Sequence, residues 1–163
     1  MSISELAKRP DANPYERLKA MGIVLPEAPS PIANFVTHVV EGKLLFLSGQ
    51  GPSEADGTLH TGKVGAGVSI EEAYGHARLT GINLIAVMHV ALGDLSRVRR
   101  VVKLLGMVNA TPEFSNHPAV INGCSDLMNV VFGERGIHAR SAVGFSSLPN
   151  QITVEIEAVV AFD

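Results

Sequence analysis

Cysteine is nearly absent from this sequence of 163 residues, in which Cys124 is the single example. One cysteine can form neither an internal disulfide nor a cysteine-based zinc cage. Long apolar runs are also missing: the longest with helical spacing, residues 82–92, is interrupted by Asn83 and His89 and falls far short of the ~20 residues that span a bilayer. Residues 1–10 carry charges and no apolar segment, so we predict no signal peptide. These absences predict a water-soluble protein of the reducing cytoplasm, with no membrane partner.

Charged residues are scarce, at 18%, and their balance is acidic, because 16 Asp and Glu against 13 Lys and Arg give a formal net charge of −3. Proteins that bind nucleic acids neutralise phosphates and usually carry a basic excess. The densest basic cluster alternates around Val98, which is typical of the solvent face of a strand; it comprises Arg97, Arg99, Arg100 and Lys103. We therefore expect no nucleic-acid partner.

Hydrophobic residues make up 46% of the chain, and the mean hydropathy is +0.23. The length fits one domain. A short, soluble chain with so many apolar residues is expected to bury apolar surface beyond its own core. This predicts an oligomer. The alternative is a tightly packed apolar monomer.

Patterns for several kinds of chemistry are absent. The six histidines show none of the spacings that are typical of metal sites; they stand at positions 38, 60, 76, 89, 117 and 138. No glycine-rich loop continues into Gly-Lys-Ser/Thr, and no serine lies in a nucleophile elbow. Cys124 falls within a predicted helix and is expected to be packed and inert. We predict neither a metal nor an organic cofactor.

We divide the chain into an N-terminal arm, residues 1–31, and an α+β domain, residues 32–163. In the arm, Asn13 can cap a short helix that begins at Pro14. The chain after this helix is predicted to be extended by Pro26, Pro29 and Pro31.

The domain is predicted to have the order ββαβαββ. Its first two strands are expected at 35–40 and 43–48, around a tight turn at Glu41 and Gly42, and its later strands at 95–108, 138–146 and 152–162. The first long helix is bounded by a capping box of Ser69 and Glu72 and by a stop at Gly93. The second spans 117–135. Two helices on one face of a sheet form an α+β sandwich.

The last two predicted strands carry the most informative pattern. In residues 152–162 the even positions are apolar and share one face, while Glu155 and Glu157 point the other way. In the preceding strand Arg140 lies among small residues, including Ala142 and Gly144. Treating the two strands as a hairpin, we expect the arginine and the two carboxylates on the same side. Arg140 can then bind a carboxylate ligand with its planar fork, with a glutamate orienting water. The alternative is an internal ion pair of Arg140 with Glu155.

Residues 48–52 (SGQGP) stand at the end of a predicted strand. Gly49 and Gly51 allow a ligand to approach the backbone closely and expose amides to it. The alternative is an ordinary loop at the end of a strand.

Three blocks together resemble a known family. Residues 48–52 resemble the SGQxP element of the Rid (reactive intermediate deaminase, YjgF-like) proteins, which are also labelled endoribonuclease L-PSP-like. The stretches 139–141 (ARS), 148–149 (LP) and 154–158 (VEIEA) resemble their ARS…LP…VEIEA signature in order and approximate spacing. The resemblance covers about residues 32–162 and identifies the chain as a member with an N-terminal extension.

The resemblance implies a chorismate-mutase-like fold that assembles as a homotrimer, with three clefts at the subunit interfaces. It implies hydrolysis of reactive enamines and imines, such as 2-aminoacrylate, to 2-keto acids and ammonia without a cofactor. Arg140 matches the arginine that binds the substrate carboxylate, Glu155 the glutamate that helps to place a water, and Gly49 a glycine that lines the cleft. Asn122 matches a helix asparagine.

Two of the matched positions differ from the family's pattern. Phe35 stands where typical members carry a tyrosine, and Ala142 where they often carry a cysteine. Three functional classes stay open on the sequence: an enamine/imine deaminase, a non-catalytic trimer that binds small keto or amino acids, and a ribonuclease or translation inhibitor. The acidic balance and the absence of a paired-histidine or two-metal pattern argue against the last.

Overall fold

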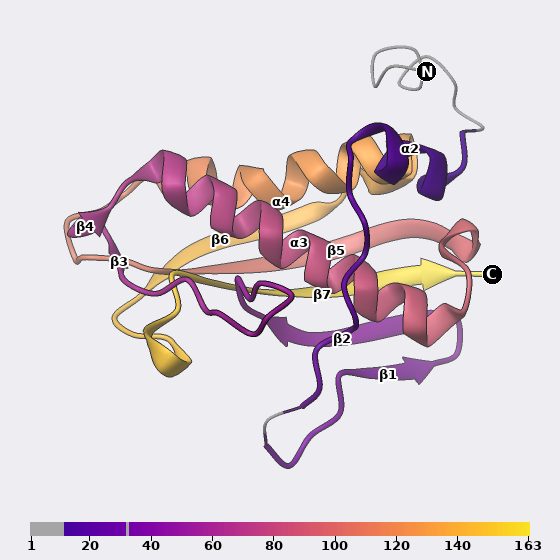
Figure 1. The fold of residues 1–163 in the computed structure, drawn as a ribbon, viewed down its shortest axis with the longest axis horizontal. Coiled ribbons are helices and arrows are strands. Elements are labelled where there is room, and N and C mark those ends of the chain that lie inside the picture. Colours follow the sequence, from indigo (N-terminus) through magenta and orange to yellow (C-terminus); the bar gives the residue numbers. More distant parts are fainter. Residues whose placement is uncertain (1–11, 32) are drawn as a thin grey trace.

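The structure is a computed structural model that describes residues 12–31 and 33–163; the stretch for which no signal peptide is predicted, residues 1–10, lies outside them. Figure 1 shows a sheet with two long helices across one face. In chain order the elements are α2 (Pro14–Ala20), β1 (His38–Glu41), β2 (Leu44–Gln50), β3 (Lys63–Val64), β4 (Gly67–Val68), α3 (Ile70–Leu92), η1 (Leu95–Arg97), β5 (Val98–Asn109), α4 (His117–Phe132), η2 (Gly133–Gly136), β6 (Ala139–Phe145), η3 (Pro149–Gln151) and β7 (Val154–Phe162).

The main sheet has the strand order β1-β2-β7-β5-β6. β5 and β6 run parallel, joined by the crossover through α4, and the other neighbours are antiparallel. β3 and β4 form a separate pair. The five-stranded sheet with α3 and α4 confirms the α+β architecture expected from ββαβαββ.

The helix ends follow their capping residues. Ser69 accepts a hydrogen bond from the Glu72 amide at 3.1 Å, while the Glu72 carboxylate accepts one from the Ser69 amide at 2.8 Å, so α3 begins with the predicted capping box. It ends at Gly93, whose φ of 74° is left-handed. Asn13 caps α2, with Pro14 in the first turn. The predicted second helix is shorter than expected: α4 stops at Phe132, and a 3-10 turn completes the segment.

The core lies between the helices and one face of the sheet. All even positions from 152 to 162 are buried, as the alternation predicts, together with Leu45 and Leu47 of β2. The opposite face keeps large apolar side chains in solvent. Phe46 is 43% exposed and Val143 40%, and neither faces a helix, because Phe46 pairs with Val159 and Val143 with Met107 on the far side.

The expected hairpin of the last two strands is wrong. β7 pairs with β2 and β5, and β5 lies between β7 and β6. The short link after β6 must therefore cross the end of β5, through the 3-10 turn η3. A short loop between two apolar strands does not by itself specify that the strands pair with each other, because another strand with a matching pattern can lie between them in the sheet.

Candidate functional site

Arg140 projects from the edge strand β6 toward helix α4. One guanidinium nitrogen, Nη1, donates to Asn122 Oδ1 at 2.8 Å and to Ser125 Oγ at 3.0 Å. Both acceptors lie on α4. Among residues 12–31 and 33–163 no carboxylate pairs with Arg140, and the N–H groups on Nε and Nη2 make no hydrogen bond. The guanidinium is thus oriented from one side and keeps donors for a second acceptor.

His138 supports this arrangement through its contact with Ser125. Ser125 Oγ also hydrogen-bonds to His138 Nε2 at 3.0 Å, and His138 Nδ1 lies 2.6 Å from the Gly136 carbonyl. Burial lowers the pKa of His138; the Gly136 hydrogen bond opposes this shift, and the Arg140 charge adds to it. A neutral imidazole beside the guanidinium leaves Arg140 as the charged group of this cluster. Sequence reasoning missed Ser125 and His138, although the position of Ser125 three residues after Asn122 on a helix was a usable signal.

Glu155 lies on the other face of the sheet. In the register, Arg140 is opposite Leu104 and Glu155 is opposite Met107, an odd number of residues along β5, so their side chains point to opposite faces. The sequence-based expectation that Arg140 and the carboxylates share one side is therefore wrong within a single chain. The alternative of an internal ion pair between Arg140 and Glu155 is excluded by the same geometry.

Glu155 opens into a cavity of about 600 Å³. Its walls include Gly49 and Phe35, two of the residues expected to bind substrate, and also Leu59 and Ile152. Glu155 makes no hydrogen bond or ion pair within the described segments. Burial, and secondly the nearby Glu157 carboxylate, raises the pKa of the Glu155 carboxyl. A half-buried carboxyl with a raised pKa at the wall of an apolar cavity is suited to exchanging a proton with a bound water or ligand.

Gly49 leaves room for the side chain of Glu155. A Cβ built on it would overlap the Glu155 carboxylate oxygen Oε1. The SGQGP loop ends β2 directly beside β7, so the glycine leaves the space that the carboxylate occupies. This is a specific role for Gly49, beyond that of an ordinary loop at the end of a strand.

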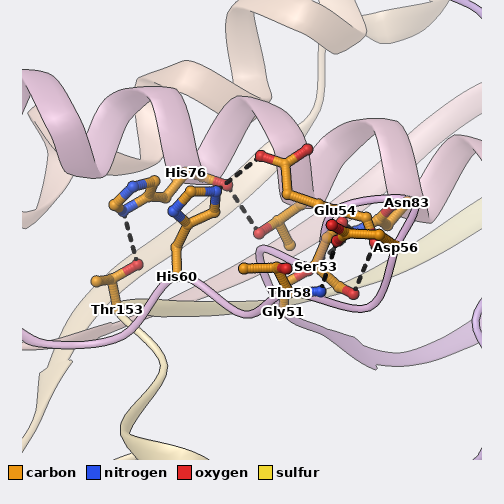
Figure 2. Close-up of polar contacts among 10 residues, drawn as sticks. Gly51, Ser53, Glu54, Asp56, Thr58, His60, His76, Asn83 and Thr153 are labelled. Atoms are coloured by element: carbon orange, nitrogen blue, oxygen red, sulfur yellow. Dashed lines mark hydrogen bonds and ion pairs between the residues drawn. The ribbon is translucent and has the colours of Figure 1, made fainter.

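Loop 51–60 forms one wall of the cavity. The loop is attached to α3 by the polar contacts that Figure 2 shows. Asn83 on α3 donates to the carbonyls of Gly51 at 3.1 Å and Ser53 at 2.9 Å. At the far end of the loop, the His60 ring stacks on His76 of α3 at 4.4 Å and lies 2.8 Å from Glu54. The loop is therefore held by α3 on both sides of the residues that face the cavity.

The structure divides the predicted site residues into two groups. Arg140 and Asn122 contact each other, and Ala142 lies two residues further along β6 on the same face. Gly49, Phe35 and Glu155 line the cavity on the far face. We call these groups the Arg140 half and the Glu155 half.

Other chemistry finds little support in the described part of the chain. It contains no group of three or more His, Cys, Asp and Glu side chains arranged to hold a metal ion. Cys124 is buried, and burial raises the pKa of its thiol to about 12. No helix among these residues has the length and apolar character to cross a membrane.

Comparison with known proteins identifies the family. The chain matches the family described as "YjgF/chorismate mutase-like, putative endoribonuclease" over residues 15–155. The chain belongs to this family, the YjgF/Rid-like one that the motifs resemble, and it has the corresponding fold.

Individual relatives extend the match to nearly the whole chain. The chain is 44% identical to Protein TCP17 of Trypanosoma cruzi over 88% of this chain and 90% of that protein. It is similar to the crystal structure of Atu1372 from Agrobacterium tumefaciens, whose function is described as unknown, with 46% identity, a TM-score of 0.86 and 92% of both chains covered. A protein from Shewanella oneidensis, described as a putative endoribonuclease, matches at 32% identity and a TM-score of 0.89 over 93% of this chain and 100% of that one. In each of these two matches, fewer residues of this chain are left unmatched than the arm contains. Part of the arm therefore has a counterpart in both proteins.

Proposed function

We propose that this protein hydrolyses reactive enamines and imines of the 2-aminoacrylate type to 2-keto acids and ammonia, in a cleft that forms between copies of the chain. The observation that carries the proposal is the state of Arg140. Its guanidinium is oriented by Asn122 and Ser125 and lacks a carboxylate partner among the described residues. An arginine held in this way is suited to a carboxylate that comes from a ligand.

The chemistry requires few groups. An enamine first tautomerises to the imine, whose carbon is already electrophilic. Water adds to this carbon, the C–N bond then breaks, and ammonia leaves as the C=O bond of the 2-keto acid forms. Arg140 would hold the substrate carboxylate, while the Glu155 carboxylate would take a proton from the attacking water and return it to the leaving nitrogen. The raised pKa of Glu155 favours its return of the proton to the leaving nitrogen.

Two copies are needed because Arg140 and Glu155 face opposite sides of the sheet. The far face also offers a surface for assembly, since Val39, Phe46 and Val143 are between 40% and 53% exposed on it. Exposed apolar surface of this kind favours contact with another chain. We propose a homotrimer, in which a ring of three such contacts brings the Arg140 half of one copy to the Glu155 half of the next.

The assembly has its own test. A charge placed at the centre of the apolar face would be buried without a partner, so Phe46→Glu should dissociate the protein into monomers in multi-angle light scattering. Val24→Glu is the matched control, because Val24 is 89% exposed and lies in the arm. A Phe46→Glu protein that keeps the mass of the wild type would argue against assembly through this face.

The activity is tested by mixing the protein with a serine or threonine dehydratase and following the decay of the imine by absorbance. We expect the wild type to accelerate this decay and Arg140→Ala to lose the acceleration. Arg99→Ala, which removes an arginine that is exposed on β5 and distant from both halves, should behave as the wild type. Keto acids that stabilise the protein against heat, without acceleration of imine decay, would show a binding protein instead and would overturn the proposal.

Ribonuclease activity is a further possible outcome, because the family description and the Shewanella relative both carry that label. The net charge of −3 and the absence of a metal-binding cluster in the described part argue against it. A highly purified, metal-free sample that cuts RNA, and loses this activity in Arg140→Ala, would favour it over deamination.

A further inference from the structure

The N-terminal arm contributes to the cavity that holds Glu155. Pro29, Ser30 and Pro31 line it, on the side reached by the chain that descends from α2. Residues so far from Glu155 in sequence reach the cavity because the arm runs over the edge of α3 and joins the sheet at β1 (Figure 1). The arm is therefore part of the candidate site.

The arm is anchored at its beginning. The Tyr15 hydroxyl accepts a hydrogen bond from the Leu95 amide at 2.9 Å and lies 2.9 Å from His89 Nδ1 on α3. Arg17 Nη1 donates to the Val130 carbonyl at 3.0 Å, and Leu18 is buried in the core. Anchors of this kind fix where the following segment can run.

The segment between the anchor and the cavity is stiff. Ile23, Leu25 and Ala28 pack against the core, and Pro26, Pro29 and Pro31 restrict the backbone. A wall that is ordered before a ligand arrives loses little conformational entropy when the ligand binds. Pro29 and Pro31 are thus preorganised for contact.

The loop that contributes Leu59 to the cavity is also fixed. Leu59 lies on loop 51–60, which Asn83 and His76 hold on α3 (Figure 2). Phe35 and Ile152 add further apolar side chains to the lining, in which Glu155 is the single acidic side chain among polar neighbours such as Thr37 and Asn150. The volume of about 600 Å³ lies within the ~300–1,000 Å³ of typical small-molecule sites and far exceeds what a three-carbon acid fills.

We infer that the arm determines substrate specificity. Pro29 and Pro31, together with Leu59, hold the apolar side chain of a 2-imino acid, so the site prefers branched or aromatic side chains over the methyl or methylene of three-carbon substrates. This inference rests on the proposed function, because that function makes the Glu155 cavity the substrate site. The polar end of the substrate then belongs to the Arg140 half, and its apolar end to the arm.

The test measures binding of stable 2-keto acids to the full chain by calorimetry, using pyruvate, 4-methyl-2-oxopentanoate and phenylpyruvate as probes. We expect the wild type to bind the two larger acids about tenfold or more tightly than pyruvate, the scale of discrimination that an apolar pocket supplies. Pro29→Ala combined with Leu59→Ala should lower this ratio about tenfold, and the exposed Leu59→Ala alone should lower it in part.

Val24→Ala combined with Leu79→Ala is the matched control. Both residues line a different cavity, between the arm and α3, so the ratio should stay at the wild-type value. Equal affinity for all three acids, no binding of any of them, or a ratio unchanged in the Pro29/Leu59 variant would overturn the inference. Tighter binding of the two larger acids without imine turnover would remove the proposed activity and leave the specificity assignment standing. Imine turnover with equal affinity for the three acids would support the activity and remove the specificity assignment.

Discussion

The Arg140 half and the Glu155 half of the site differ in how each holds its charged group. Arg140 is fixed by the hydrogen bonds that it donates to Asn122 and Ser125 of α4, and Ser125 is in turn hydrogen-bonded to His138. Glu155 receives no hydrogen bond in the described segments and sits in an apolar cavity that raises its pKa. Hydrogen bonds to the charged form preserve a fixed charge, whereas burial of a carboxyl makes its proton exchangeable. One half is therefore built to bind a charge, and the other to exchange a proton.

We expect the largest effects on catalysis from substitution of the two charged residues themselves. Glu155→Gln keeps the shape of the side chain but removes the proton exchange, so kcat for imine hydrolysis should fall by about a hundredfold or more, with KM nearly unchanged. Arg140→Ala should instead raise KM by about thirtyfold or more, because a charge-assisted contact to the carboxylate is lost. Steady-state kinetics on both variants measures the split. Equal changes in kcat and KM for the two variants would contradict the division of roles.

A smaller effect is expected from Gly49→Ala. The added methyl group must displace the Glu155 carboxylate, and a misplacement of about 1 Å can cost up to a hundredfold in rate, so we expect a fall in kcat of about tenfold or more. Gly75→Ala is the matched control, since a Cβ there meets no atom within 4 Å and alanine favours the helix α3. If both glycine variants keep wild-type kcat, then Gly49 does not serve to admit the carboxylate.

The smallest effect concerns the pH dependence of stability. Burial, and secondly His60, lowers the pKa of His76 below 6.5, while Glu72 and Glu54 oppose the shift. The unfolded chain then binds more protons than the folded one as the pH falls through 6.5, so the contribution of His76 to the free energy of unfolding is full above that pH and is lost below it. His76→Gln should therefore flatten the decline between pH 7.5 and 5.5, by at most about 0.5 kcal/mol because the site is partly exposed.

Urea denaturation of both proteins across this pH range gives the difference directly. His138 carries a shift in the same direction in the Arg140 half, so His138→Gln should behave likewise. A His76→Gln protein whose stability falls more steeply at acid pH than that of the wild type would contradict the sign.

The two halves also differ in how far the sequence predicts them. Local signals were sufficient where one residue decides: Ser69, Glu72 and Gly93 set the limits of α3, and the alternation in β7 set its buried face. The structure places Gly49, Phe35 and Glu155 at one cavity and Arg140 against Asn122. Whether Arg140 and Glu155 lie on the same face of the sheet was not predictable, because it depends on β5 lying between β6 and β7, which is a long-range pairing.

The arm shows the same limit. Pro26, Pro29 and Pro31 predict extended chain, and the structure assigns neither helix nor strand to residues 23–31. The sequence offers no signal that Pro29 and Pro31 meet Glu155, since that contact depends on the docking of α2 through Tyr15 and on the path over α3. Local chemistry thus predicts conformations, while the assembly of distant segments creates the cavity.

If the two halves meet between copies of the chain, two variants that each lack one half should complement each other when they are mixed. Arg140→Ala retains an intact Glu155 half, and Glu155→Gln retains an intact Arg140 half. After subunit exchange in an equal mixture, about a quarter of all sites combine both intact halves, so imine hydrolysis should return to about a quarter of the wild-type rate. Mixed oligomers that stay as inactive as their parents would contradict the account, because each copy would then carry its site alone.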